Sequence, residues 1–359
     1  EGGLGADKLY GGNGNDTIYS DDGADIIDGG ADIDLLLFTG GTNRVVVNLS
    51  TSAITYDTTN QLAANSVLDV VGYTDTVVNL SIENVTGGTG ADTFMGSTGN
   101  NTLNGADGND YFYASLGADS IIGGNGTDTL DFTNLTTTAG VNVTLNTSLA
   151  FSGITQTVST MENFTGSAQN DTITGDGAAN LLIGGAGADT LKGMAGADVI
   201  YGGIGDDSID GGAANDTLYG DAGNDLFTID FSAIDTIDGG ANTLKDTVKF
   251  NSGNTGTSIA TDTNFVMSST LTNIEKLDIT GLTLNTANNS TEFNFTEAMI
   301  DAWTGNATGN LTLSLKSSQV EKIMFTDSGG TVRDSAAEIV DNTTYTIGNS
   351  SLTIDITDV

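Results

Sequence analysis

Several residue types are missing from this chain of 359 residues, and each absence removes a class of function. Without cysteine there is no disulfide and no thiol chemistry, and without histidine there is no Ser-His-Asp or Cys-His nucleophile. The His-Glu-x-x-His zinc site is excluded for the same reason. No apolar run of about eighteen residues occurs, so the sequence shows no transmembrane helix. Proline is absent too, whereas 50 glycines are available for turns.

Positive charge is also scarce. Nine Lys and Arg residues stand against 47 Asp and Glu residues, which gives a formal net charge of −38. Six of the nine cations lie after residue 240, so the preceding part of the chain is more acidic still. Such a charge argues against nucleic acid or an anionic membrane as a binding partner.

The most regular feature is a nine-residue phrase of the form Gly-Gly-x-Gly-x-Asp-x-(apolar)-x, of which the chain has sixteen in-frame copies, some with a substituted glycine or aspartate. Residues 11–19 spell it in full, and it runs in frame through three blocks. Its sixth position carries Asp7, Asp16, Asp25 and Asp34, then Asp92, Asn101, Asp110, Asp119 and Asp128, then Asp171, Asn180, Asp189, Asp198, Asp207, Asp216 and Asp225. A period of this length is typical of a solenoid.

Each phrase predicts a short strand and a tight turn. Strand side chains alternate faces, so the apolar residue two places after Asp points inward. Glycine at the first, second and fourth positions supplies the backbone conformations of a sharp reversal. Two phrases make one coil of about eighteen residues, and stacking brings the aspartates of repeats n and n+2 together.

Stacked carboxylates repel one another unless a cation lies between them, and the residues present favour calcium. Calcium accepts six to eight oxygens at about 2.3–2.6 Å, whereas zinc and copper prefer nitrogen or sulfur ligands. We therefore predict about ten Ca²⁺ ions, each bridging turns n and n+2. The predicted ligands are the fourteen aspartates of the three blocks and carbonyls of the glycine turns, represented by Gly12, Gly14, Gly124, Gly126, Gly185, Gly187, Gly203 and Gly205.

These phrases resemble the RTX (repeats-in-toxin) nonapeptide. The resemblance covers residues 2–37, 87–131 and 166–228, with a degenerate copy from Gly239 to Val248. It implies an all-β fold, a parallel β-roll or β-helix solenoid with calcium in both rows of turns. We expect weaker or missing ions beside five departures from the pattern: Asn101, Asn180, Asp32, Ala178 and Ala214.

Between the blocks the phrase disappears and β-rich excursions take its place. The first two excursions resemble each other, since each returns through Glu-Asn, at Glu83 and at Glu162. Those glutamates suggest a metal or catalytic role, and the favoured alternative is a buried turn or cap at re-entry. The predicted domains are blocks 1–37, 87–131 and 166–248, excursions 38–86 and 132–165, and a C-terminal β domain 249–359.

The C-terminal domain is expected to end the solenoid as a cap without calcium. Alternating residues predict strands at 311–315 and 352–356, and a short helix is expected from Thr296 to Gly305. The single Trp303 is assigned to the core rather than to a ligand site. Resemblance to RTX exports implies a secretion signal in this stretch.

No catalytic motif is found, so we expect no enzymatic activity. The leading hypothesis is a secreted, calcium-dependent structural protein of the bacterial cell surface, a component of a surface-layer (S-layer) lattice. Its expected partners are other copies of itself and a cell-surface polysaccharide. The alternative is the C-terminal calcium-folding and secretion region of a larger adhesin, toxin or hydrolase. Self-association in calcium separates the two.

Overall fold

The computed structural model describes most of the repeat region and selected strands beyond it. The described residues are 2–3, 5–19, 24–38, 44–52, 54–55, 61–68, 74–77, 81–135, 139–151, 153–229, 235–240, 246–250, 270–272, 274, 276–278, 293–295, 310–316, 323–326, 332–333, 343–347 and 350–357. The chain divides into two compact units, Glu1–Asp176 and Gly177–Val359. Each unit is a parallel β-solenoid, which confirms the predicted fold class.

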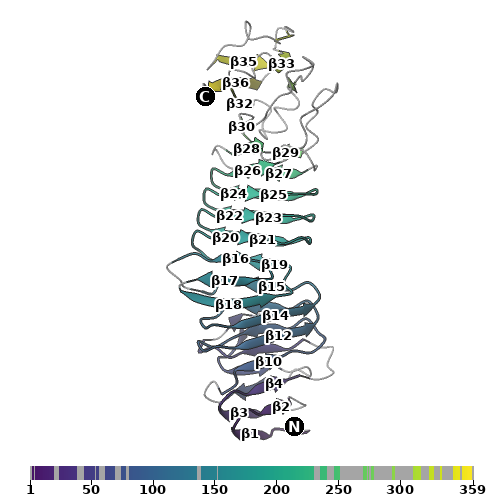
Figure 1. The fold of residues 1–359 in the computed structure, drawn as a ribbon, viewed down its shortest axis with the longest axis vertical. Coiled ribbons are helices and arrows are strands. Elements are labelled where there is room, and N and C mark those ends of the chain that lie inside the picture. Colours follow the sequence, from purple (N-terminus) through teal and green to yellow (C-terminus); the bar gives the residue numbers. More distant parts are fainter. Residues whose placement is uncertain are drawn as a thin grey trace. The chain divides into compact units, whose positions relative to one another are not determined.

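Two sheets line the first unit, and Figure 1 shows their strands as successive rungs. One sheet contains, in spatial order, β1 (Lys8–Asn13), β3 (Ile26–Ala31), β9 (Thr74–Val77), β8 (Ser66–Leu68), β5 (Val46–Asn48), β11 (Thr93–Met95), β13 (Tyr111–Tyr113), β15 (Thr129–Asp131) and β19 (Asn163–Thr165). The other contains β2 (Thr17–Tyr19), β4 (Leu35–Leu37), β10 (Asn84–Thr86), β12 (Thr102–Asp107), β14 (Ser120–Asn125), β18 (Ile154–Ser159), β17 (Ser148–Phe151), β16 (Asn142–Thr144) and β20 (Thr172–Thr174). A separate hairpin pairs β6 (Ile54–Thr55) with β7 (Gln61–Leu62).

The strand register confirms a coil of two phrases. Leu103 of β12 lies opposite Ile121 of β14, and Phe94 of β11 lies opposite Phe112 of β13. The two phenylalanine rings stack with centroids 5.0 Å apart, and both side chains are fully buried. The apolar residue of each phrase therefore fills the core, with Leu9 in the first phrase only half-buried.

Strand length alternates, which the nine-residue period alone does not predict. Three-residue strands such as β13 alternate with six-residue strands such as β14, which run on through the glycines of the following turn. Within these longer strands Ala106 pairs with Gly124, and Gly185 pairs with Gly203. The true structural repeat is thus a pair of unequal phrases.

The first two excursions are three-stranded insertions into the sheets. β9, β8 and β5 lie between β3 and β11, and β18, β17 and β16 lie between β14 and β20. In both insertions the inner pairings are antiparallel and the outer pairings to the roll are parallel. The opposite sheet continues directly, because β10 pairs with β4 and β19 pairs with β15. The first insertion thus adds strands to the sheet that contains β3 and β11, and the second adds strands to the sheet that contains β14 and β20.

The second unit has the same two-sheet arrangement. One sheet contains β21 (Leu181–Ala186), β23 (Val199–Ile204), β25 (Thr217–Ala222), β27 (Thr236–Asp238) and β29 (Thr270–Thr272). The other contains β22 (Thr190–Lys192), β24 (Ser208–Asp210), β26 (Leu226–Ile229), β28 (Thr247–Phe250), β30 (Lys276–Asp278), β32 (Asn310–Lys316), β36 (Ser350–Thr357) and β35 (Thr343–Ile347). A third sheet contains β31 (Phe293–Phe295), β33 (Ile323–Thr326) and β34 (Val332–Arg333).

The C-terminal strands expected from alternation are present as β32 and β36, which pair in parallel. The helix expected from Thr296 to Gly305, with Trp303, lies outside the described residues. Within the described ranges every element is a strand, and none is a helix that could span a bilayer.

Candidate metal centre

The aspartates at the sixth position form hydrogen-bonded columns. The backbone N–H of most of them donates to the Oδ1 atom of the residue one coil later, as from Asp92 to Asp110 at 2.7 Å and from Asp110 to Asp128 at 2.7 Å. The same bond joins Asp189 to Asp207 and Asp207 to Asp225, at 2.8 Å and 2.9 Å. Aspartates eighteen residues apart are therefore neighbours, as the coil length predicts.

The other predicted aspartates follow the same rule. Asp7 donates to Asp25, Asp16 to Asp34, Asn101 to Asp119, Asn180 to Asp198, and Asp198 to Asp216. Where an excursion rejoins the roll, the Oδ1 atom accepts from a valine and not from an aspartate one coil earlier: Asp92 accepts from Val45 N–H, and Asp171 accepts from Val141 N–H.

The second carboxylate oxygen of many of these aspartates is buried without a hydrogen bond. This holds for the Oδ2 atoms of Asp16, Asp34, Asp110, Asp128, Asp207, Asp216 and Asp225. Asp34 and Asp128 are fully buried, and Asp216 and Asp225 are each 1 % exposed. A buried anionic oxygen without a donor costs several kcal/mol of solvation, roughly 2–7 kcal/mol even for a neutral polar group. Such atoms fit a bound cation.

Burial has raised the pKa of several of these carboxyl groups. The pKa of Asp110 is raised to about 7 by desolvation, with further repulsion from Asp92 and Asp128. Desolvation by burial likewise raises the pKa of Asp216 and of Asp225 to about 7. Burial raises the pKa of Asp128 and Asp207 to about 6. The metal-free site therefore disfavours the charged carboxylate, which a divalent cation would stabilise.

Glycine at the first position of a turn leaves an oxygen-lined space beside the carboxylate. A Cβ atom on Gly184 would lie 2.5 Å from Asp189 Oδ2 and 2.5 Å from the carbonyl oxygen of Gly202. At Gly220 a Cβ would meet Asp225 Oδ2 and, at 2.9 Å, the carbonyl oxygen of Gly239. A carboxylate oxygen and a carbonyl of the next coil thus converge at each such glycine.

The glycines predicted as carbonyl donors adopt the left-handed conformation that the turns need. All eight have positive φ: Gly12, Gly14, Gly124, Gly126, Gly185, Gly187, Gly203 and Gly205. The carbonyl oxygens of Gly12 and Gly185 point at the positions where a Cβ would stand on Gly30 and Gly203. A side chain there would block the stacking of turns.

This donor set fits a hard divalent cation. The oxygens belong to carboxylates and carbonyls, which calcium prefers. Among the described residues no three Asp or Glu side chains gather closely enough to hold an ion by themselves. Backbone carbonyls would therefore complete the coordination, and each ion would lie between turns rather than in one turn.

Two residues extend the columns beyond those predicted. Asp216 donates to Asp235 Oδ1 at 3.1 Å, and Asp225 donates to Asp246 Oδ1 at 2.8 Å. Their spacings are 19 and 21 residues, so a strict search at nine misses them. An Asp that precedes an apolar strand after a longer glycine turn is the signal that could have found them.

Glu83 and Glu162 cap the columns where the excursions return. Glu83 Oε2 accepts from Asp34 N–H at 3.0 Å, and Glu162 Oε2 accepts from Asp128 N–H at 2.8 Å. Each glutamate thus takes the place that an aspartate has in a regular coil. The favoured interpretation of these residues as re-entry caps is confirmed.

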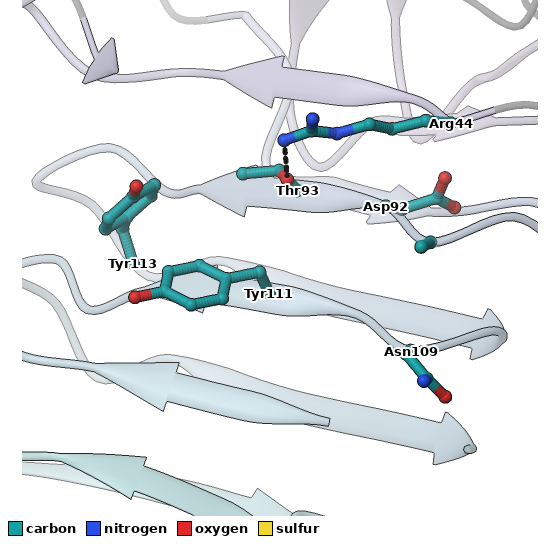
Figure 2. Close-up of a pocket in the computed structure, with 7 residues that line it drawn as sticks. Arg44, Asp92, Thr93, Asn109, Tyr111 and Tyr113 are labelled. Carbon is teal, nitrogen blue, oxygen red and sulfur yellow. Dashed lines mark hydrogen bonds between the residues drawn. The ribbon is translucent and has the colours of Figure 1, made fainter. Parts of the chain in front are cut away.

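A pocket of about 240 Å³ lies beside the first re-entry, and Figure 2 shows its polar side chains. Arg44 Nη2 donates to Thr93 Oγ1 at 2.9 Å, and Asp92 accepts from Val45 N–H and Gly88 N–H. Burial raises the pKa of Asp92 to about 6, and Arg44 opposes that shift. These bonds hold β5 against β11, while the rings of Tyr111 and Tyr113 line the remaining wall.

Comparison with known proteins identifies the repeat. A family model described as the RTX calcium-binding nonapeptide repeat (4 copies) matches residues 1–36, 86–121, 112–133, 159–191 and 192–227. No curated protein matches the chain. Repeats of this family bind calcium and are typical of proteins that leave the cell by type I secretion.

Proposed function

Because this chain carries RTX calcium-binding nonapeptide repeats, we propose that it is a calcium-folded structural protein of the bacterial cell surface, a component of a surface-layer lattice. The observation that carries the proposal is the column of buried aspartates whose second oxygens accept no hydrogen bond, as at Asp110, Asp207 and Asp225. A roll built this way is complete only with a cation, and export delivers the chain to a calcium-rich medium.

Calcium would act first as a folding ligand. The unfolded chain has no preformed site, so the binding free energy of each ion becomes folding free energy. Extracellular modules bind calcium with dissociation constants of about 10⁻⁴–10⁻³ M, far above the concentration in a cytosol. The chain would therefore remain unfolded until export and fold outside. The proposed ligands are the columns that contain Asp16 and Asp34, Asp110 and Asp128, and Asp189 to Asp225.

Exposed apolar side chains at the turns support lateral assembly. Ile204 is 67 % exposed and Ile33 is 55 % exposed, and Met194 and Leu116 are exposed as well. All four belong to glycine turns, where an apolar side chain adds nothing to the core of the roll. Such residues suit contacts between neighbouring copies, so self-association is the proposed working state.

The proposed attachment partner is a cell-surface polysaccharide. The pocket beside Arg44 offers two tyrosine rings and a guanidinium group on one face of the first unit (Figure 2). Flat rings with polar edges are suited to ligands that have both apolar and hydroxyl faces. Replacing Tyr113 by Ala should weaken retention on purified cell-wall polysaccharide without changing calcium binding. Equal retention of both proteins would remove this pocket from the proposal.

Self-association in calcium tests the lattice role directly. Purified chain given millimolar calcium should form sheets or ordered oligomers, visible by negative-stain electron microscopy and light scattering. The variant Ile33→Ser with Ile204→Ser should fold and bind calcium equally but assemble less. A folded, calcium-loaded chain that stays monomeric at high concentration favours the alternative, a calcium-folding region of a larger exported adhesin, toxin or hydrolase.

A further inference from the structure

The glycine turns use two hydrogen-bonding arrangements. In open turns the second residue has positive φ, and the Oδ2 atom of the final aspartate accepts no hydrogen bond. Gly203 and Asp207 illustrate this arrangement, as do Asp221 and Asp225. In closed turns the second residue donates to the final side chain. Ser167 N–H donates to Asp171 Oδ2 at 2.6 Å, and Ser97 N–H donates to Asn101 Oδ1 at 2.8 Å.

The turn from Ala114 to Asp119 is closed in a further way. Ser115 Oγ donates to Asp119 Oδ2 at 2.9 Å. The side chain of Gln156, which comes from β18 of the second excursion, reaches the same atom, and its Nε2 donates to Asp119 Oδ2 at 2.8 Å. The same nitrogen donates to the carbonyl oxygens of Ser115 at 3.0 Å and Gly117 at 3.2 Å.

These three acceptors are of the kinds a calcium ion would bind in a turn: the aspartate carboxylate and the carbonyls of the second and fourth positions. Gln156 is fully buried, so its amide group belongs to the interior of the roll. Its Oε1 atom has no hydrogen-bond partner, and exchanging the two amide atoms would place oxygen against three acceptors. The contacts therefore fix the nitrogen at the centre of this oxygen cluster.

We propose that the Gln156 amide replaces a calcium ion at the Ala114–Asp119 turn, so that this turn closes without metal while the open turns require it. The proposal rests on the calcium-dependent folding proposed above and refines it, because it removes Asp119 from the ligands. It also gives the second excursion a role in folding. Its strand β18 pairs with β14 and brings a neutral donor to a turn that would otherwise present bare oxygens.

The isosteric variant Gln156→Glu tests this assignment, because it changes the donor nitrogen to an acceptor oxygen without changing shape. The introduced carboxylate oxygen would face the Asp119 carboxylate and the carbonyl oxygens of Ser115 and Gly117 in place of the amide donor. The turn would then need a cation. We expect the variant to bind about one additional calcium ion per chain by calorimetric titration. Its thermal midpoint should fall below that of wild type at the lowest calcium concentration that keeps wild type folded, and should recover in millimolar calcium. Gln61 on β7 is exposed, so Gln61→Glu is the control for the added charge. It should neither bind an additional ion nor lower the thermal midpoint.

The outcomes separate the two proposals. Wild-type protein that binds no calcium would overturn the calcium-folding role itself. Suppose instead that wild type binds calcium, but Gln156→Glu has unchanged calcium stoichiometry and the same loss of thermal midpoint at both calcium concentrations. That result would overturn only the assignment of Gln156. A variant that stays unfolded in calcium contradicts that assignment too. Asp119→Asn and Asp128→Asn give an independent check, since only the second should lower calcium stoichiometry.

Discussion

The turn that ends at Asp207 and the turn that ends at Asp119 have equal length and the same last residue, but they satisfy that residue differently. Asp207 accepts one backbone bond from Asp189, and its second oxygen is left bare. Asp119 accepts from Asn101, Ser115 and Gln156. An aspartate at the sixth position therefore does not by itself mark a metal site. The second residue of the turn, and what the excursions bring to it, decide the matter.

The largest expected effect comes from removing carboxylates of open turns. The double variant Asp207→Ala with Asp216→Ala should lose calcium and should raise the calcium concentration needed for folding by about tenfold or more, because each ion loses a charged ligand. Calcium titration followed by circular dichroism measures this. Asp119→Ala, in the closed turn, is the matched control and should leave the calcium stoichiometry unchanged. Equal calcium loss in both proteins would erase the distinction between open and closed turns.

A core substitution should destabilise the roll without touching its metal sites. Phe112 is fully buried against Phe94, and truncating a buried phenylalanine typically costs about 3–5 kcal/mol. Phe112→Ala should lower the free energy of unfolding by about that amount in saturating calcium, as measured with urea. The number of bound ions should stay the same. A loss below about 1 kcal/mol would mean that the ring stack is not the core of this block.

Metal-free protein should become less stable as the pH rises. Burial raises the pKa of Asp110, Asp216 and Asp225 to about 7, above the unfolded value near 4, so the folded state binds more protons between these values. The stability of the metal-free roll should therefore be greatest at or below about pH 4 and decline from there toward pH 7. Far-ultraviolet circular dichroism of calcium-stripped protein at several pH values, which should show β content falling as the pH rises toward 7, checks the sign. Stability that rises with pH in the absence of calcium would show that these carboxylates are not strained by burial.

The smallest expected effect concerns a turn where a residue other than glycine takes a left-handed conformation. Ala214 has φ of 84°, which costs an L-residue roughly 1–2 kcal/mol. Ala214→Gly should stabilise the calcium-loaded protein by about 1 kcal/mol in thermal or urea unfolding. The neighbouring Ala213, which bridges to Ala195, is the control, and Ala213→Gly should destabilise. Two equal effects of either sign would contradict a strain at Ala214.

Much of the fold could be predicted because its determinants are local and periodic. The apolar residue two places after each aspartate is buried except for Leu9, and the eight glycines named as carbonyl ligands have positive φ. The long contacts could not be predicted from the period. Gln156 lies 37 residues from Asp119, and Val45 lies 47 residues from Asp92, and both are joined only through inserted strands. Asp235 escaped because a longer turn displaces it from the frame, and Asp246 fell in the degenerate copy but was not named among the ligands.

The second position of the phrase was the neglected signal. Ser97, Ser115 and Ser167 stand there in closed turns, and Gly88 also closes its turn by donating its N–H to Asp92 Oδ2. Serine at this position supplies a hydroxyl that bonds the final side chain, as Ser115 and Ser167 do. Serine at this position therefore indicates a closed turn, whereas glycine does not by itself indicate an open one.

Removal of calcium from the whole chain tests the central claim most directly. Far-ultraviolet circular dichroism and the hydrodynamic radius would be followed in millimolar calcium, in excess EGTA and after calcium is restored. At neutral pH we predict a compact β-rich chain with calcium, an expanded chain of low β content without it, and full recovery. A chain that keeps its β content and its compact radius in EGTA would contradict the conclusion that calcium closes the stacked aspartate turns.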